Sequence, residues 1–311
     1  MQLGIGKGWV LPQSLVVKIL PQLKAITTKD DTQSIFWGPI TQLPENIGET
    51  DKIRLTEEWH KAIQTVVNPA YTKMYTFLQK EYLPACRSSS GIGALKGGDE
   101  WYKYCIRYWT TTSLSPDSIY KIGEAEVARI EGEMNRIREQ VGFKGNLQQF
   151  FAYVGKDKKF FPFASAEQVI DSFEGIHRLE EPMVKKLFRL TPKTRFTIRR
   201  TEAFREASAS AEYNQGSEDG TRPGIFYVPV PDPAKFNCVG MATLFLHEAI
   251  PGHHYQISLQ QENKELPAFR RFLWYGAYGE GWAHYCETLG GDLGVYNDPW
   301  QYFGHLSDAI H

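Results

Sequence analysis

The stretch TLFLHEAIPGHHYQ, residues 243–256, places His247, Glu248, His253 and His254 within eight residues. The first His–Glu pair is surrounded by four apolar or small residues, namely Leu244, Phe245, Leu246 and Ala249. We therefore expect a buried helix that carries polar groups inward. Burying an imidazole beside a carboxylate is costly unless each group has a partner. A divalent metal with a bound water would supply both partners, so a zinc site is the first hypothesis.

The spacing departs from HExxH, in which two imidazoles lie one helical turn apart and the glutamate beside the first reaches the metal's water. Four residues after His247 comes Pro251, which cannot ligate, lacks an N–H and clashes with the carbonyl four residues back. Together with Gly252 it predicts a bulge, after which His253 takes the second ligand position. His254 returns to the same face, but two helical turns separate it from His247 by about 10.5 Å. Because two zinc-bound nitrogens can be at most about 4 Å apart, we favour His253 as the ligand and give His254 an outer or substrate-contacting role.

A third ligand is expected from GEGWAHYCETLGG, residues 279–291. Glu280, His284 and Glu287 recur there at spacings of four and three, so they can share one helical face. Glu280 follows His253 by 27 residues, which allows a second helix to pack against the first. Glu287 is better placed as a carboxylate that orients a ligating imidazole. His284 could do the same or bind substrate.

The bulk composition excludes some classes of function. The 311 residues carry a formal net charge of −1, with no basic excess, so we expect no nucleic-acid partner. No apolar run approaches the roughly 20 residues of a membrane-spanning helix, and the N-terminal residues lack the features of a signal peptide. The sequence gives no indication of oligomeric state.

Residues 1–192 are predicted to be mostly helical. The clearest helix starts at Pro116, is capped by Ser115 and ends at Gly142, and its apolar residues recur every three to five positions. A separate helix is expected over about 180–189. Three further residues are predicted helix caps: Asn68, Asn146 and Ser165.

The pattern changes at about residue 193. Three stretches have the Thr, Ile, Val and aromatic content of strands, namely 195–204, 209–213 and 224–230. We expect a small antiparallel sheet directly before the His–Glu helix. The predicted fold class is mainly α (α+β), with a helical region over 1–192 and the sheet and metal-binding helices over 193–311, together one continuous fold.

HEAIPGHHYQ followed by GEGWAHYCETLG resembles the bacterial family called domain of unknown function 885. Many members of that family are labelled lipoproteins, and the family is placed in the gluzincin metallopeptidase superfamily. Three further stretches support the resemblance, which covers nearly the whole chain: 123–134, 160–170 and 219–230. It implies a helical, zincin-like cleft protein with His247, His253 and Glu280 as zinc ligands and Glu248 as general base. It also suggests a periplasmic or cell-envelope location, and longer flanking regions, so that the chain looks truncated at both ends.

The leading hypothesis is zinc-dependent hydrolysis of a peptide or related amide bond. Glu248 would take a proton from water at the metal and pass it to the leaving amine. Four residues are candidates for stabilising the oxyanion: Tyr227, Tyr275, Tyr278 and His284. Arg222 could pair with a substrate carboxylate, or could form a structural salt bridge instead. The resemblance makes the strand around 226–228 the expected cleft edge, where an extended peptide could add.

Two rival hypotheses remain. The first is a catalytically inactive protein that binds metal and peptide. The second is a structural helical protein whose histidines only pack.

Overall fold

The computed structural model describes residues 1–27, 30–206 and 209–311, and it leaves out the side chains of residues 203 and 204. The chain separates into two compact units, residues 1–105 and 106–311. The boundary falls inside helix α7 (Gly98–Thr110). The change of sequence pattern at residue 193 therefore lies within the second unit, where it marks the start of the sheet.

The first unit is helical. Its α-helices are α1 (Gln2–Lys7), α2 (Gln13–Ile26), α3 (Gly38–Thr41), α4 (Glu49–Ala62), α5 (Asn68–Phe77) and α6 (Leu83–Ala85). The π-helical segments η3 (Ile63–Val67) and η4 (Leu78–Tyr82) join α4, α5 and α6 into one run. A small core of Val16, Leu78 and Tyr82 holds α2 against this run.

The predicted cap at Asn68 is wrong, because Asn68 has helical dihedral angles (φ −59°, ψ −44°) inside this run. The sequence suggested a helix start because Pro69 follows. Each π-helical segment ends one residue before an X–Pro pair, at Pro69 and at Pro84. A π turn changes the hydrogen-bonding register. The helix thus passes through both prolines, and a terminus is not required there.

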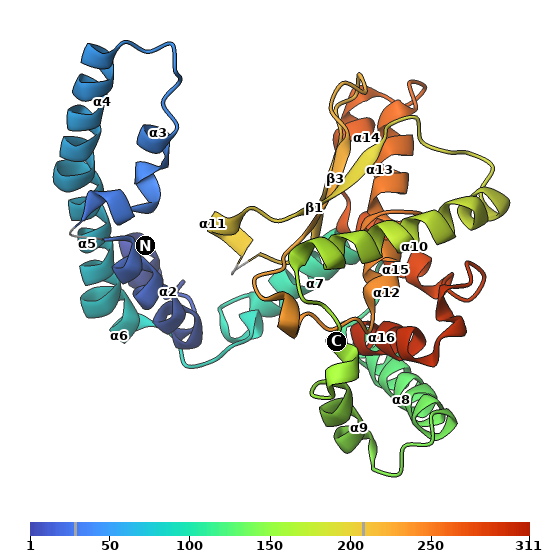
Figure 1. Cartoon of the computed structure of the whole chain (residues 1–311). Coiled ribbons are helices and arrows are strands. Elements are labelled where there is room, and N and C mark those ends of the chain that lie inside the picture. Colours follow the sequence, from blue (N-terminus) through green and yellow to red (C-terminus); the bar gives the residue numbers. More distant parts are fainter. Residues whose placement is uncertain (28–29, 207–208) are drawn as a thin grey trace. The chain divides into compact units, whose positions relative to one another are not determined.

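The second unit contains the other helices and the only sheet of the described residues. Its α-helices are α8 (Pro116–Gln140), α9 (Leu147–Val154), α10 (Ala166–Leu187), α11 (Ala203–Glu206), α12 (Met241–Glu248), α13 (His253–Glu262), α14 (Ala268–Phe272), α15 (Gly276–Thr288) and α16 (Pro299–Ala309) (Figure 1). Its strands are β1 (Phe196–Arg200), β2 (Glu212–Asn214) and β3 (Gly224–Val228). Short 3₁₀ turns in both units cover Asp31–Gln33, Ile35–Trp37, Ile92–Ala94, Lys158–Phe160, Pro233–Lys235 and Val295–Asn297. The chain is thus mainly helical with a small sheet, as predicted, and within the described ranges no helix is long and apolar enough to cross a membrane.

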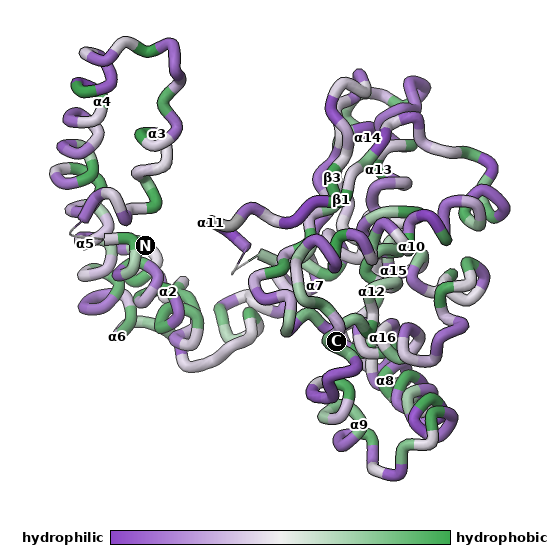
Figure 2. Tube along the Cα trace, viewed as in Figure 1, coloured by the Kyte–Doolittle hydropathy of each residue, from purple (hydrophilic) through white to green (hydrophobic). Residues whose placement is uncertain are grey.

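Two of the remaining predicted caps are confirmed in full. The Ser118 N–H donates to the Ser115 side chain at the start of α8. Asn146 and Gln149 form a reciprocal capping box at the start of α9. α8 buries one of its faces. Hydrophilic and hydrophobic residues alternate along this helix (Figure 2). These signals were readable in the sequence because a cap needs only neighbours within four residues.

Ser165 also caps its helix, since the Gln168 N–H donates to its side chain, but that helix is longer than expected. The separate helix predicted over 180–189 is wrong, because α10 runs unbroken from Ala166 to Leu187 with Pro182 inside it. Its buried residues Val169, Phe173 and Val184 belong to a single hydrophobic core. Packing along the whole face therefore outweighs the local penalty of the proline.

The sheet is mixed, which corrects the antiparallel prediction. Its strand order is β1-β3-β2, with β3 antiparallel to β2 but parallel to β1. β2 and β3 are joined by a reversing loop, whereas β1 reaches β3 only through a crossover that includes α11 and β2. β3 is consequently the central strand. The predicted cleft edge at 226–228 is wrong as well, because both sides of β3 are already paired.

A hydrophobic core between α10, the sheet and α12 fixes the position of the His–Glu helix. Phe173 of α10 meets Phe226 of β3 edge to face, with ring centroids 5.2 Å apart. Phe245 and Leu246 of α12 are fully buried in the same core. A second core, formed by α8, α9 and α16, is connected to α12 because α12 contacts α16. Both cores thus fix α12 before any polar group is considered.

Glu180 of α10 is a buried carboxyl group without a hydrogen-bond partner among the described residues, so the stability of the fold should depend on pH. It is 0% exposed, and neither carboxylate oxygen has a hydrogen-bond partner among the described residues. Burial raises the pKa of Glu180 well above its ordinary 4.5. The folded state therefore binds a proton that the unfolded state releases, and stability falls as pH rises above about 4.5.

We expect Glu180→Gln, which mimics the protonated acid and does not titrate, to be increasingly more stable than wild type between pH 5 and 8. The difference should grow by at most about 1.4 kcal/mol per pH unit. Urea denaturation across this range measures it. The matched control is Glu181→Gln on the same helix, because a hydrogen bond from Lys185 lowers the pKa of Glu181. Parallel pH profiles for wild type and Glu180→Gln would contradict the assignment.

Candidate metal centre

The helix that carries His247 and Glu248 is interrupted where Pro251 and Gly252 predicted a bulge. α12 ends at Glu248 and α13 begins at His253. Ala249 leaves the helical region (φ −104°, ψ −106°), and the Ile250–Pro251 peptide is cis. A Cβ on Gly252 would lie 1.9 Å from the carbonyl oxygen of His247, so only glycine fits this close approach.

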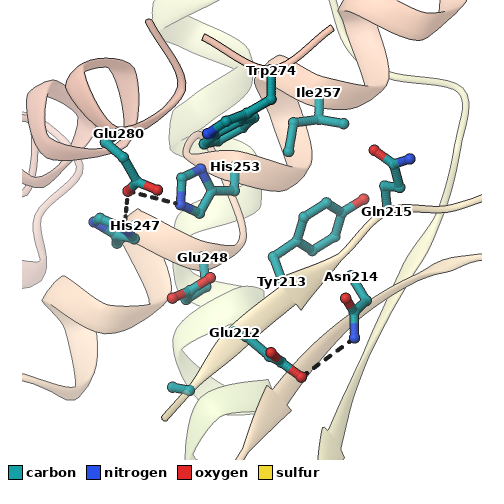
Figure 3. A pocket seen from close by; sticks show the side chains of 11 residues that line it. Glu212, Tyr213, Asn214, Gln215, His247, Glu248, His253, Ile257, Trp274 and Glu280 are labelled. Carbon is teal, nitrogen blue, oxygen red and sulfur yellow. Dashed lines mark hydrogen bonds and ion pairs between the residues drawn. The ribbon is translucent and has the colours of Figure 1, made fainter. Parts of the chain in front are cut away.

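The break brings His247, His253 and Glu280 together (Figure 3). Glu280 Oε2 lies 3.5 Å from His247 Nε2 and 3.4 Å from His253 Nε2. The two imidazole rings are nearly perpendicular, with centroids 4.7 Å apart. The three residues expected to ligate a metal thus point their donor atoms at one another.

This donor set fits zinc. Two His nitrogens and one Glu oxygen form a ligand set of catalytic zinc sites, with bonds of about 2.0–2.2 Å. Two ligand atoms on such bonds at tetrahedral angles are about 3.4 Å apart, which matches the two distances from Glu280. Burial lowers the pKa of His253 to about 4, with the charge of His247 as a second cause, so this imidazole is neutral and has a lone pair to offer at neutral pH.

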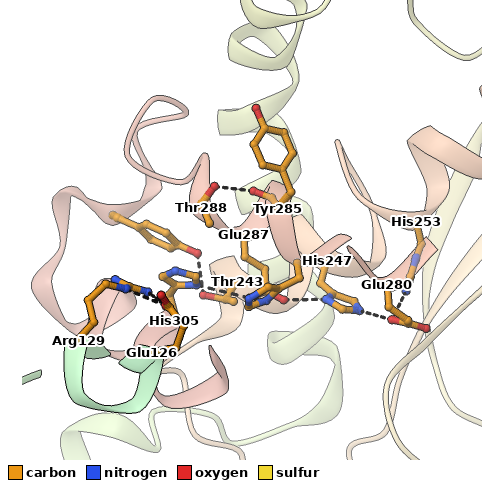
Figure 4. A network of polar contacts seen from close by, with 12 residues as sticks. Glu126, Arg129, Thr243, His247, His253, Glu280, Tyr285, Glu287, Thr288 and His305 are labelled. Carbon is orange, nitrogen blue, oxygen red and sulfur yellow. Dashed lines mark hydrogen bonds and ion pairs between the residues drawn. The ribbon is translucent and has the colours of Figure 1, made fainter. Parts of the chain in front are cut away.

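Glu287 orients His247 from the opposite side of the ring (Figure 4). Its Oε1 is 2.8 Å from His247 Nδ1, while its Oε2 lies 3.2 Å from His284 Nδ1 and 3.5 Å from His305 Nδ1. Burial alone would raise the pKa of Glu287, but hydrogen bonds from these three histidines outweigh it and hold the pKa well below its ordinary value. An ionised Glu287 accepts the Nδ1 proton of His247. The Nε2 atom of His247 therefore faces Glu280 and the position a metal would occupy.

Glu248 lies beside this group and is buried. Burial is the main cause that raises the pKa of Glu248 to about 7, and the charge of the adjacent His247 partly opposes it. A carboxylate with such a pKa can both take and release a proton near neutral pH. Glu248 opens into a pocket of about 520 Å³ that His247, His253 and Glu280 also line.

The sequence did not identify the residues that form the far wall of this pocket. They come from β2 and its flanks, and from two residues after the break: Ala211, Glu212, Tyr213, Asn214, Gln215, Ile257 and Trp274. The stretch 209–213 was predicted to be a strand, but its place beside the metal ligands depends on the strand order. Trp274 lies edge-on to His253, with centroids 5.7 Å apart. The Trp274 ring fits there only because residue 279 is a glycine, since a Cβ at Gly279 would come within 2.1 Å of the ring.

Several predicted site residues lie outside the pocket. Tyr278 and Tyr275 line a separate cavity of about 1270 Å³. Tyr227 stacks under Arg205, whose Cζ is 4.8 Å from the ring centroid. Arg222 is exposed and does not line the pocket, although its backbone N–H donates to Ser217. These placements depend on which way each side chain points from its strand, loop or helix.

The two other histidines predicted for the site, His284 and His254, contact different residues. His284 is exposed and contacts Glu287, so it reaches the ligands only through that carboxylate. His254 is buried, and its Nδ1 lies 2.9 Å from the Tyr213 hydroxyl. His253, rather than His254, therefore faces Glu280, which is the arrangement that helix geometry favoured.

Comparisons with known proteins agree with the fold and leave the activity open. Residues 1–311 match the family described as "Bacterial protein of unknown function (DUF885)". The crystal structure of the "putative lipoprotein" from Colwellia psychrerythraea is similar, with a TM-score of 0.91 and 29% sequence identity. The similarity covers 99% of this chain and 54% of that one, so the chain spans about half of its length. A comparison with curated proteins gave no match.

We expect Glu287→Gln to weaken zinc binding by about 10- to 100-fold, because an amide holds the His247 ring less firmly and adds no negative charge. Competition with a chromogenic chelator measures the affinity, and circular dichroism checks folding. Glu181→Gln, which changes an exposed carboxylate outside the site, should bind zinc as wild type does. An unchanged affinity in folded Glu287→Gln would show that the carboxylate does not act on the ligand.

Proposed function

The chain belongs to this bacterial family of unknown function, and we propose that it is a zinc-dependent hydrolase of peptide or related amide bonds. The observation that carries the proposal is the convergence of His247, His253 and Glu280 on one point, with Glu248 in the same pocket. Two histidines and a glutamate as ligands are also what the gluzincin resemblance of the sequence implies. Zinc bound there would polarise the scissile carbonyl and promote ionisation of water.

Glu248 is proposed as the general base. Its carboxylate would accept a proton from the attacking water and then deliver it to the leaving amine. The buried position supports this role, because a pKa of about 7 lets the same group act in both directions. His247 cannot share the role, since its Nδ1 is held by Glu287 and its Nε2 faces Glu280.

An extended peptide is the substrate shape that the pocket wall supports. Among the described residues β2 pairs with β3 alone, so its other edge has backbone groups available for an added strand. Residues 211–215, which contain β2, line the pocket with Glu248. A peptide that pairs with this edge would place its backbone along the pocket wall, and Trp274 would contact its side chains. β2 is thus the proposed peptide-binding edge, a role that the sequence had suggested for β3.

We expect Glu248→Gln to keep its zinc and to lose about 10²- to 10⁴-fold in kcat/KM, the usual contribution of a general acid–base group. Zinc content by elemental analysis and cleavage of an unbiased peptide mixture, followed by mass spectrometry, provide the two readouts. The control is Glu181→Gln, which should match wild type in both.

Three other outcomes would change the assignment. Equal cleavage by a zinc-bearing Glu248→Gln would remove Glu248 as the base. A wild-type protein that binds zinc and peptides without turnover would instead support a binding protein with an enzyme-like site. An absence of zinc binding would reject both functions.

A further inference from the structure

His254 is the second member of the His253–His254 pair, yet it faces away from the metal ligands. It is 3% exposed and packs against Phe196 of β1, with ring centroids 4.6 Å apart. It lines a different cavity, of about 410 Å³, together with Thr194 and Ile250. Adjacent residues at the start of α13 thus point to opposite sides, and His254 must serve another partner.

The partner of His254 is Tyr213 of β2. The Tyr213 hydroxyl lies 2.9 Å from His254 Nδ1, and Ser258 Oγ, one turn along α13, lies 3.3 Å from the same nitrogen. We therefore assign the ring proton to Nε2, which leaves Nδ1 to accept from the Tyr213 hydroxyl.

The position of the Tyr213 ring is shaped by its neighbours. A Cβ at Gly224, in β3, would lie 2.3 Å from the Tyr213 hydroxyl oxygen and 2.7 Å from Cε2. The ring therefore lies directly over the glycine, where any other residue would displace it. The hydroxyl consequently has a fixed direction toward His254.

Tyr213 also lies beside the candidate base, because both residues line the same pocket (Figure 3). The strand that carries it is short, with three residues paired to β3. So short an edge strand has few ladder hydrogen bonds of its own, so a side-chain contact such as Tyr213–His254 adds to its order.

We propose that His254 is a positioning residue: through the Tyr213 hydroxyl it fixes β2, so that the strand edge stays at the pocket beside Glu248. This inference rests on the proposed function for the role of Glu248, whereas the tether itself does not. It assigns separate tasks to the two adjacent histidines, since His253 serves the metal and His254 the edge strand.

The test compares Tyr213→Phe, His254→Phe and the double variant. Tyr213→Phe keeps the ring over Gly224 and removes only the hydroxyl, so it tests the tether even if the buried His254→Phe fails to fold. The matched control is Tyr227→Phe, because Tyr227 lies on β3 outside the pocket. Hydrogen exchange of the amides of residues 211–215 is measured in the metal-free proteins, followed by zinc affinity and peptide cleavage.

We expect Tyr213→Phe to exchange these amides about 3- to 10-fold faster, the effect of losing one ordinary hydrogen bond. His254→Phe should give a similar factor, and the double variant should add little, because both substitutions remove one interaction. Zinc affinity should stay within about twofold, since the ligands are untouched. Cleavage should lose kcat/KM, because the strand that borders Glu248 and would pair with the peptide is less ordered while the metal is retained.

Each outcome decides between the claims. Unchanged exchange in Tyr213→Phe, or additive effects in the double variant, would overturn the tether even if the protein is an active peptidase. Faster exchange in Tyr213→Phe, combined with a wild-type protein that cleaves no peptide, would support the tether and reject its role at the pocket together with the proposed function. Loss of zinc affinity in Tyr213→Phe would also overturn the proposal, because it would place the effect on the metal ligands.

Discussion

The backbone break between Glu248 and His253 is the constraint on which the candidate site depends. A continuous helix would carry the next histidine on the His247 face two turns away, too far for a shared metal. Pro251 prevents that continuation, and Gly252 permits the backbone to approach the carbonyls of residues 246 and 247. α13 can then begin at His253, whose ring meets His247 nearly at right angles.

The break would have no chemical use if its flanking helices were free to move. Phe245 and Leu246 hold α12 in the core under the sheet, and Glu287 of α15 bonds His247 from behind. Glu280 comes from the same helix as Glu287, so α15 supplies both a prospective ligand and the group that orients another. One buried carboxylate with three imidazole contacts thus connects α12, α15 and α16 in a region where charges interact strongly.

How well the sequence predicted this fold depended on the range of each interaction. The caps at Ser115 and Asn146 were readable because they involve neighbours within four residues. The cap at Asn68 was wrong because a π turn carries the helix through Pro69, and the split of α10 was wrong because packing along its face outweighs the effect of Pro182. Strand stretches were found approximately, but the direction of β1 and the central place of β3 follow from the crossover between them.

The sequence by itself determined the elements of the site that lie close together in the chain. Proline and glycine between His247 and His253 required an interrupted helix, and spacings of four and three aligned Glu280, His284 and Glu287. Only the tertiary structure decided which of these side chains meet, because that depends on how α15 packs on α12 and α13. It also decided that β2, and not β3, forms the pocket wall, and that Tyr227 and Tyr278 point elsewhere. Strand order and side-chain direction arise from contacts between distant residues, which no local pattern of the chain encodes.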